Sequence, residues 1–176
     1  MTEGAGPSVT ARDDLAGVVD LFGWLTREEL SRAVSELAFK RRAEADTDAI
    51  DDAIDVAVAE YALVPAPVEA VSIEGTGDEL GEDDDPLAVG PAAFPSLPEG
   101  AADLPHILDV PDRTVDRETL SGAVHDRLSS DAVAAITEED AERLEVLVDV
   151  TYDVETWAPV DASAIRERIL AELDGE

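Results

Sequence analysis

Hydrophobic residues recur at helical spacing near the start of the chain and predict three consecutive helices. The first helix ends close to Gly23, a residue suited to a helix C-terminus. The second begins at Thr26, which forms a capping box with Glu29 three residues later. The third has the most regular apolar stripe, which consists of Ile50, Ala53, Ile54, Ala57, Val58 and Tyr61.

The spacing changes after Tyr61 and predicts extended chain instead of helix. Residues 62–74 (ALVPAPVEAVSIE) and 86–98 (PLAVGPAAFPSLP) each have the composition of a strand, and their prolines disfavour helix. A glycine-rich and acidic loop at 75–86 joins the two strands. Three helices followed by two strands and their loop is the element order of a winged helix.

The last third of the chain returns to helical spacing, with helix starts predicted at Asp116, Thr137 and Asp161. The expected fold is therefore mainly α with a small β-hairpin: a winged-helix-like N-terminal unit plus a C-terminal helical unit. The alternative is one compact domain that contains both. The expected divisions are a disordered tail at 1–10, the winged-helix-like unit at 11–95 and the helical unit at 96–176.

The charge of the chain changes the functional expectation. Asp and Glu number 43 against 12 Lys and Arg, for a net charge of -31, and Lys40 is the single lysine. At about 1 M salt the Debye length falls to about 3 Å, which screens the resulting self-repulsion. The composition therefore indicates a halophilic, salt-requiring surface and disfavours polyanionic partners such as nucleic acid.

Several classes of function are excluded or disfavoured by what the sequence contains. The absence of cysteine excludes disulfides and thiol chemistry. No signal peptide or apolar run of membrane-spanning length is found, so we expect a soluble, cytoplasmic protein. No metal-ligand spacing, catalytic motif or phosphate loop is found either. We expect no cofactor, no metal and no enzymatic activity.

The chain's one basic cluster, Lys40, Arg41 and Arg42, lies at the end of the second helix. Two interpretations remain open: the cluster contacts phosphate, or it complements the helix dipole. In a winged helix the third helix enters the DNA groove. Its polar face here carries carboxylates, which are those of Asp48, Asp51, Asp52, Asp55 and Glu60.

Two aromatic residues are candidates for a protein contact. Phe94 and Trp157 are expected in non-helical segments next to prolines, as is Tyr152. In one interpretation they fasten connecting segments onto the helices; in the other, Phe94 or Trp157 is an exposed partner contact.

Four segments resemble an uncharacterised family of unknown function from halophilic archaea: LAGVVDLFGWLTREELSRAVSELAFK, AIDDAIDVAVAEYALV, VGPAAFPSLPEGAADLPHILDVPDRTVDRETL and LVDVTYDVETWAPVDASAIRERI. The resemblance supports a salt-adapted cytoplasmic protein and implies no site. The leading hypothesis is a non-enzymatic protein-interaction or regulatory module with a partner of unknown identity. The alternative is a winged-helix DNA-binding transcriptional regulator, and an enzyme is the weakest option.

Overall fold

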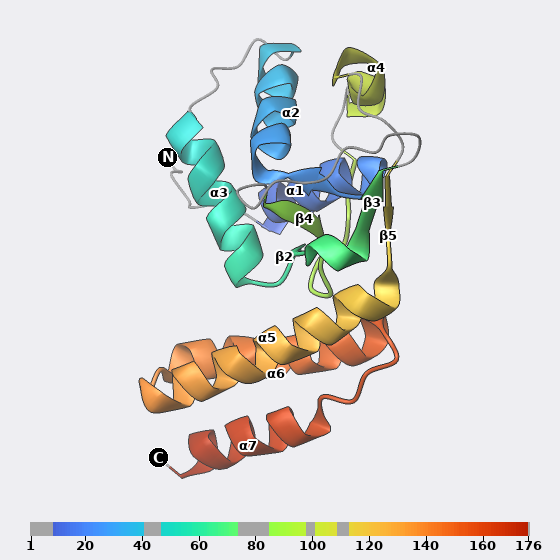
Figure 1. The fold of residues 1–176 in the computed structure, drawn as a ribbon. Helices are drawn as coiled ribbons and strands as arrows, with labels where there is room; N and C mark the ends of the chain where they lie inside the picture. Colours follow the sequence, from blue (N-terminus) through green and yellow to red (C-terminus); the bar gives the residue numbers. More distant parts are fainter. Residues whose placement is uncertain (1–8, 41–46, 74–84, 98–100, 109–112, 176) are drawn as a thin grey trace, which may run out of the picture. The chain divides into compact units, whose positions relative to one another are not determined.

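The computed structural model describes residues 9–40, 47–73, 85–97, 101–108 and 113–175 (Figure 1). The chain divides into two compact units, Met1–Val115 and Asp116–Glu176. This division falls later in the chain than the boundary expected at residue 96. We call the two parts the N-terminal unit and the C-terminal unit and describe each by itself.

The first helix of the N-terminal unit, α1 (Val9–Phe22), begins two residues inside the segment expected to be a disordered tail. It ends at Gly23, whose φ of 94° lies in the left-handed region that glycine adopts without strain. The Gly23 amide donates to the carbonyl of Val19 at 2.9 Å. The sequence prediction of a glycine at this helix end is confirmed.

The second helix, α2 (Arg27–Lys40), follows the short strand β1 (Leu25–Thr26). Both hydrogen bonds of the predicted capping box form. The Glu29 amide donates to Thr26 Oγ1 at 3.1 Å, and the Thr26 amide donates to Glu29 Oε1 at 2.9 Å. Two backbone donors that the helix leaves unpaired are thereby satisfied by local sequence alone.

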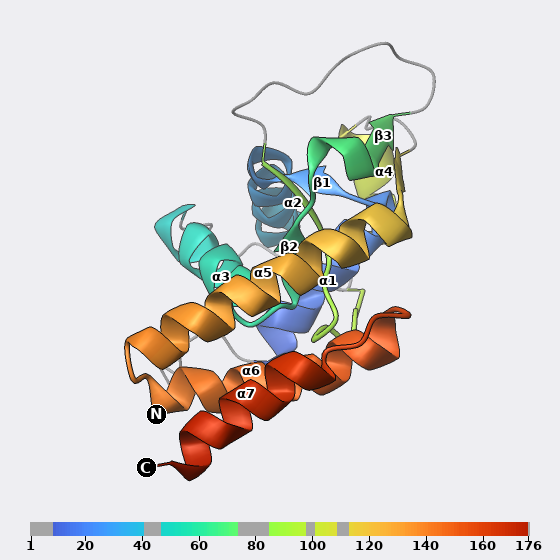
Figure 2. The same ribbon diagram turned by 60° about the horizontal axis from the view of Figure 1, so that its bottom comes forward.

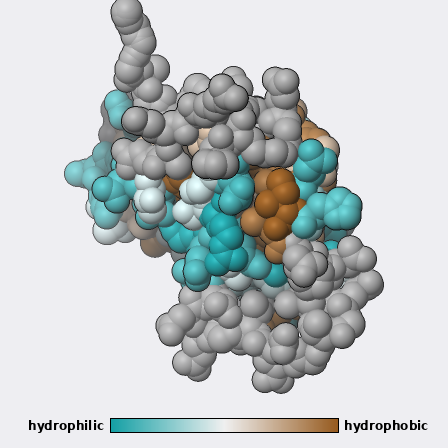
Figure 3. Space-filling view, turned by 90° about the horizontal axis from the view of Figure 1, so that it is seen from above, coloured by the Kyte–Doolittle hydropathy of each residue, from teal (hydrophilic) through white to brown (hydrophobic). Residues whose placement is uncertain are grey.

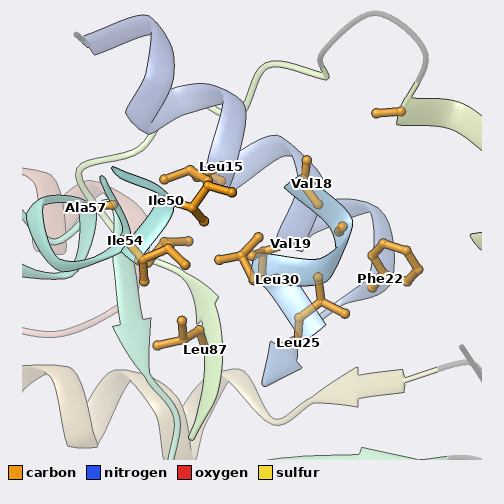
Figure 4. Packing of buried hydrophobic residues seen from close by; sticks show 14 of the residues in the cluster. Leu15, Val18, Val19, Phe22, Leu25, Leu30, Ile50, Ile54, Ala57 and Leu87 are labelled. Carbon is orange, nitrogen blue, oxygen red and sulfur yellow. The ribbon is translucent and has the colours of Figure 1, made fainter. Parts of the chain in front are cut away.

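The third helix, α3 (Thr47–Ala59), buries the apolar stripe read from the sequence. Ile50, Ile54 and Ala57 face the inside of the N-terminal unit, where side chains from α1, α2 and β4 surround them (Figure 4). This core is mostly aliphatic, with Phe22 as an aromatic member, and it also includes Leu15 and Leu30, which are almost completely inaccessible. It fixes α3 with one face inward and the opposite face outward.

A three-stranded antiparallel sheet completes this helical layer. Its strands are β1, β2 (Leu63–Pro65) and β4 (Pro86–Val89), in the spatial order β1-β4-β2. The register pairs Val64 with Ala88 and Leu25 with Leu87. The fold class predicted from sequence, mainly α with a small β-hairpin in a winged-helix-like order, is confirmed.

The prediction of one strand over residues 62–74 is wrong. Pro65 ends β2, and the chain then forms a short 3-10 helix, η1 (Val68–Ala70), before β3 (Val71–Ile73). β3 pairs with β5 (Arg113–Val115) instead of with β4. Proline cannot donate to a strand ladder, so the two prolines at 65 and 67 interrupt the pairing.

Two short elements that the sequence patterns did not indicate lie between β4 and β5: the 3-10 turn η2 (Ala101–Asp103) and the five-residue helix α4 (Leu104–Leu108). Ala101 and Leu104 are buried in the same core as α1 and α2. Most of the predicted acidic loop, residues 75–84, lies outside the described residues, and Pro86 at its end belongs to β4.

The C-terminal unit consists of α5 (Arg117–Thr137), α6 (Ala141–Trp157) and α7 (Ser163–Asp174), which lie side by side (Figures 1 and 2). Asp116 caps α5 as predicted, by accepting from the Glu118 amide at 3.2 Å. All three helices of the C-terminal unit contribute side chains to its buried core. The largest completely buried side chains in it are those of Leu120, Leu128, Leu144, Leu147 and Ile169.

Two expectations for this unit are wrong. Thr137 does not begin a helix: it is the last residue of α5, and Asp140 caps α6 by accepting from the Arg143 amide at 3.1 Å. Tyr152 and Trp157 are not in a loop, because α6 extends to Trp157. α6 continues to Trp157 because the ring of Pro159 clashes sterically only with the backbone of the preceding residue, Ala158, and disfavours the helical conformation there.

Candidate interaction surfaces

The outward face of α3 is acidic, as the sequence indicated. Asp48, Asp52 and Asp55 are exposed, and Asp51 is partly buried. These four residues follow the i, i+3, i+4, i+7 spacing that places side chains on one side of a helix. In a winged helix this is the side that meets DNA, so a carboxylate row stands where cationic side chains are needed.

An open groove of about 600 Å³ adjoins this face, between the first half of α2 and the start of α3. Ser31, Ser35 and Thr47 contribute hydroxyl groups to it, and Asp51 and Asp85 contribute carboxylates. The lining of the groove therefore offers both hydrogen-bond donors and acceptors.

Arginine side chains in the groove are already engaged by carboxylates of the same unit. Arg27 Nη2 donates to Asp55 Oδ1 at 2.6 Å and to the Asp51 carbonyl at 3.0 Å. Arg32 lies 3.6 Å from a Glu28 oxygen one helical turn away. Their charge is balanced locally, so they add little positive potential for an incoming phosphate.

The same use of arginine recurs through the described part of the chain. The arginines that lie within 4.0 Å of a carboxylate oxygen are Arg12, Arg27, Arg32, Arg113, Arg127, Arg143 and Arg166. Among the described residues, most arginines therefore pair with carboxylates of the protein itself, which leaves few cationic groups there to bind a polyanion.

The structure does not describe the side chains of the basic cluster that was predicted as a phosphate contact. α2 ends at Lys40, but the Lys40 side chain and the whole of Arg41 and Arg42 lie outside the described residues. The helix-dipole and phosphate-contact interpretations of the cluster both stay predictions.

Phe94, the first predicted aromatic contact, is exposed. Its side chain is 77% accessible, and Leu97 nearby is 50% accessible. Both residues follow β4 in an irregular segment that hydrogen-bonds to α1: the Phe94 amide donates to Asp13 Oδ1 at 3.2 Å. Of the two predicted aromatic contacts, Phe94 has the exposure that a partner contact needs.

Trp157, the second predicted aromatic contact, is partly buried at the end of α6. The Arg117 guanidinium lies 4.7 Å from its ring centroid, and Arg117 Nη2 donates to the Trp157 carbonyl at 3.3 Å. This cation–π contact joins the start of α5 to the end of α6. The structure thus gives Trp157 a role inside the C-terminal unit.

Sequence reasoning missed the most buried ion pair of the N-terminal unit. Arg113 in β5 is only 6% exposed at its side chain, and it donates two hydrogen bonds of 2.6 Å to the two oxygens of Glu29. Its guanidinium also lies 4.2 Å from the Trp24 ring centroid. The capping box did identify Glu29, but no local pattern indicates a partner 84 residues away.

The Glu29 carboxylate responds to this environment. Burial favours its neutral form, yet the hydrogen bonds from Arg113 and Thr26 outweigh burial, and they hold the pKa of Glu29 below its ordinary value of 4.5. The carboxyl therefore stays ionised at neutral pH, and it links the start of α2 to β5.

The face shown in Figure 3 is the end of the N-terminal unit that carries α4. A brown, hydrophobic area right of the centre of this view is bordered by hydrophilic residues. Ile107 in α4 is 45% exposed. No site is assigned to this area.

Within the described ranges, no group of three His, Asp or Glu side chains is arranged to hold a metal ion. In the same ranges, every helix is too short or too polar to span a bilayer.

The fold and surface define a class: a winged-helix-type unit with an acidic third helix, followed in the chain by a three-helix unit. The chain belongs to a family of unknown function (DUF7109), whose model matches residues 13–174. No curated protein and no solved structure matches the chain. The expected membership of an uncharacterised family is confirmed; the expected source in halophilic archaea stays a prediction.

Proposed function

We propose that this protein is a non-enzymatic interaction module whose N-terminal unit binds a basic segment of another protein. The observation that carries the proposal is the acidic outward face of α3, on which Asp48 and Asp52 are exposed beside the groove. A partner rich in Lys and Arg complements this face, and such complementarity fixes specificity and speeds encounter.

The winged-helix architecture by itself favours a different function, which is the binding of DNA by a transcriptional regulator. Phosphate neutralisation supplies most non-specific DNA affinity and falls steeply with salt. The α3 face repels phosphate, and the groove arginines Arg27 and Arg32 are paired with carboxylates. The surface therefore supports an interaction module more strongly than a DNA reader, because function follows the site and not the fold.

A pair of matched charge reversals tests the proposal. Asp48→Lys with Asp52→Lys reverses the α3 face, and Glu145→Lys with Asp149→Lys reverses two exposed residues at the same spacing on α6. Each pair raises the net charge of -31 equally, since every acid-to-lysine change adds two units. The tagged full chain is purified from its native host in molar potassium chloride, and co-purifying proteins are quantified.

We expect the α3 pair to lower the yield of a basic partner by about tenfold or more and the α6 pair to leave it unchanged. Circular dichroism of both variants checks that they are folded. Equal loss in the two variants contradicts the proposal. Binding of duplex DNA in molar salt that is abolished by Lys40→Glu with Arg41→Glu establishes the alternative, a DNA-binding regulator.

A further inference from the structure

The segment that follows β4 exposes two large apolar side chains in an otherwise strongly acidic molecule. Phe94 is 77% accessible and Leu97 is 50% accessible, and Phe94 is the most exposed large hydrophobic residue in the described part of the chain. An aromatic side chain left in water forgoes the free energy that its burial supplies. This exposure is not explained by the packing of the N-terminal unit.

The backbone of this segment is held firmly against α1. The Phe94 amide donates to Asp13 Oδ1 at 3.2 Å, and the Ser96 amide donates to the Asp13 carbonyl at 3.1 Å. The segment approaches α1 so closely that a Cβ at Gly17 would lie 2.0 Å from the Ser96 carbonyl oxygen. Only glycine permits this approach.

A second close contact holds the start of the segment. The Ala92 amide donates to the Tyr61 carbonyl at 3.0 Å, and a Cβ at Gly90 would lie 2.2 Å from the same oxygen. The backbone is therefore fixed at both ends while the side chains of Phe94 and Leu97 are left outside. A rigidly presented aromatic residue is suited to binding because little conformational entropy is lost on contact.

The charge around the segment indicates what can cover it. The Asp13 carboxylate accepts from the Phe94 amide and lies 4.0 Å from Arg12 Nε, and residues 64–105 contain no Lys or Arg. A second copy of the chain would bring an equally acidic surface and a net charge of -31. A different protein, with an apolar pocket rimmed by Lys and Arg, complements both features.

We infer that Phe94 and Leu97 form an anchor that inserts into an apolar pocket of a protein partner whose rim is basic. This inference rests on the proposed interaction function and names a surface of the same unit. In concentrated salt, charge attraction is screened within a few ångströms, about 3 Å at 1 M. Apolar burial is not weakened in this way, so the anchor carries a large part of the affinity there.

The absence of cysteine makes the anchor directly testable. Leu97→Cys in the full chain provides one attachment point for a benzophenone photocrosslinker and leaves Phe94 in place. Tyr152→Cys, at a residue that is 53% exposed in the C-terminal unit, is the matched labelling control. Both labelled proteins are irradiated in extract of the native host in molar potassium chloride, and the crosslinked protein is identified and purified.

We expect the Leu97 label to capture a basic protein and the Tyr152 label not to capture it. The purified partner then binds the unlabelled wild-type chain at least about tenfold more tightly than Phe94→Asp, because a central aromatic anchor is a typical hot spot. Val68→Asp, at a residue that is 52% exposed in the same unit, changes the affinity less than about twofold.

Three outcomes overturn the inference: equal affinity of wild type and Phe94→Asp for the partner, capture of a second copy of this chain, or equal capture by both labels. If reversal of the α3 charges abolishes binding of the partner but Phe94→Asp does not, the proposed function holds and the Phe94 anchor is contradicted. If Phe94→Asp abolishes binding but reversal of the α3 charges does not, the anchor holds and the proposed role of the α3 face is contradicted.

Discussion

At the scale of single residues, the buried Arg113 side chain links two segments of the N-terminal unit that lie far apart in the sequence. It donates to Glu29 and to the Trp24 carbonyl, and it stacks on the Trp24 ring, so one guanidinium joins β5 to the segment between α1 and α2. We expect Arg113→Met to lower the free energy of unfolding by about 2–4 kcal/mol, because Glu29 is left partly buried without its counter-ion.

Chemical denaturation measures this loss, and Arg32→Met is the control. Arg32 forms an exposed pair with Glu28, with side chains 59% and 86% accessible, so its replacement costs no more than about 0.5 kcal/mol. Equal losses of unfolding free energy in the two variants would show that the Arg113–Glu29 pair stabilises the protein no more than an exposed ion pair does.

The Glu29 carboxyl gives a second residue-scale prediction, in its titration. Its folded pKa lies below 4.5, so its contribution to stability is complete above that pH and is lost as the pH falls through the folded value. Arg113→Met removes the main group that lowers this pKa, and we expect the pKa to rise. NMR titration of the Glu29 side-chain carboxyl measures it; an unchanged pKa would contradict the assignment of its cause to Arg113.

At the scale of elements, two helical glycines provide a matched pair of tests. Alanine favours the interior of a helix over glycine by about 0.5–1 kcal/mol. Gly122 lies on the exposed side of α5 with nothing within 4 Å of an added Cβ, so Gly122→Ala is expected to stabilise the C-terminal unit by about this amount.

Gly17 in α1 has the same low helix propensity, but we expect its replacement by alanine to have the opposite effect on stability. An added Cβ would meet the Ser96 carbonyl at 2.0 Å, which forces the segment carrying Phe94 away from α1. We expect Gly17→Ala to destabilise the N-terminal unit by about 1–3 kcal/mol. Thermal unfolding of both variants compares the two signs, and a stabilising Gly17→Ala would show that the segment is not tightly held.

At the scale of the whole molecule, the net charge of -31 predicts a requirement for salt. Screening weakens as salt is removed, and repulsion among carboxylates then opposes the folded state. We expect the unfolding midpoint to fall on dilution below about 0.5 M potassium chloride, where the Debye length exceeds about 4 Å. A midpoint that is the same at low and molar salt would contradict a salt-adapted surface.

The features that rest on local pattern could be predicted from the amino-acid sequence alone. Thr26 and Glu29 form the capping box that their spacing indicates, and Ile50, Ile54 and Ala57 bury the face that their period indicates. Gly23 ends α1 as expected. These succeed because hydrogen bonds and faces within one helix involve residues three or four positions apart.

The features that depend on residues distant in the chain could be identified only from the three-dimensional structure. The pairing of β3 with β5, the Arg113–Glu29 ion pair and the closeness of Gly17 to Ser96 each join segments far apart in the chain. Composition marked Phe94 as a candidate, but its exposure follows from how its backbone packs on α1. Such contacts produce no periodic pattern in the sequence, because they form between helices and strands that pack together around one hydrophobic core.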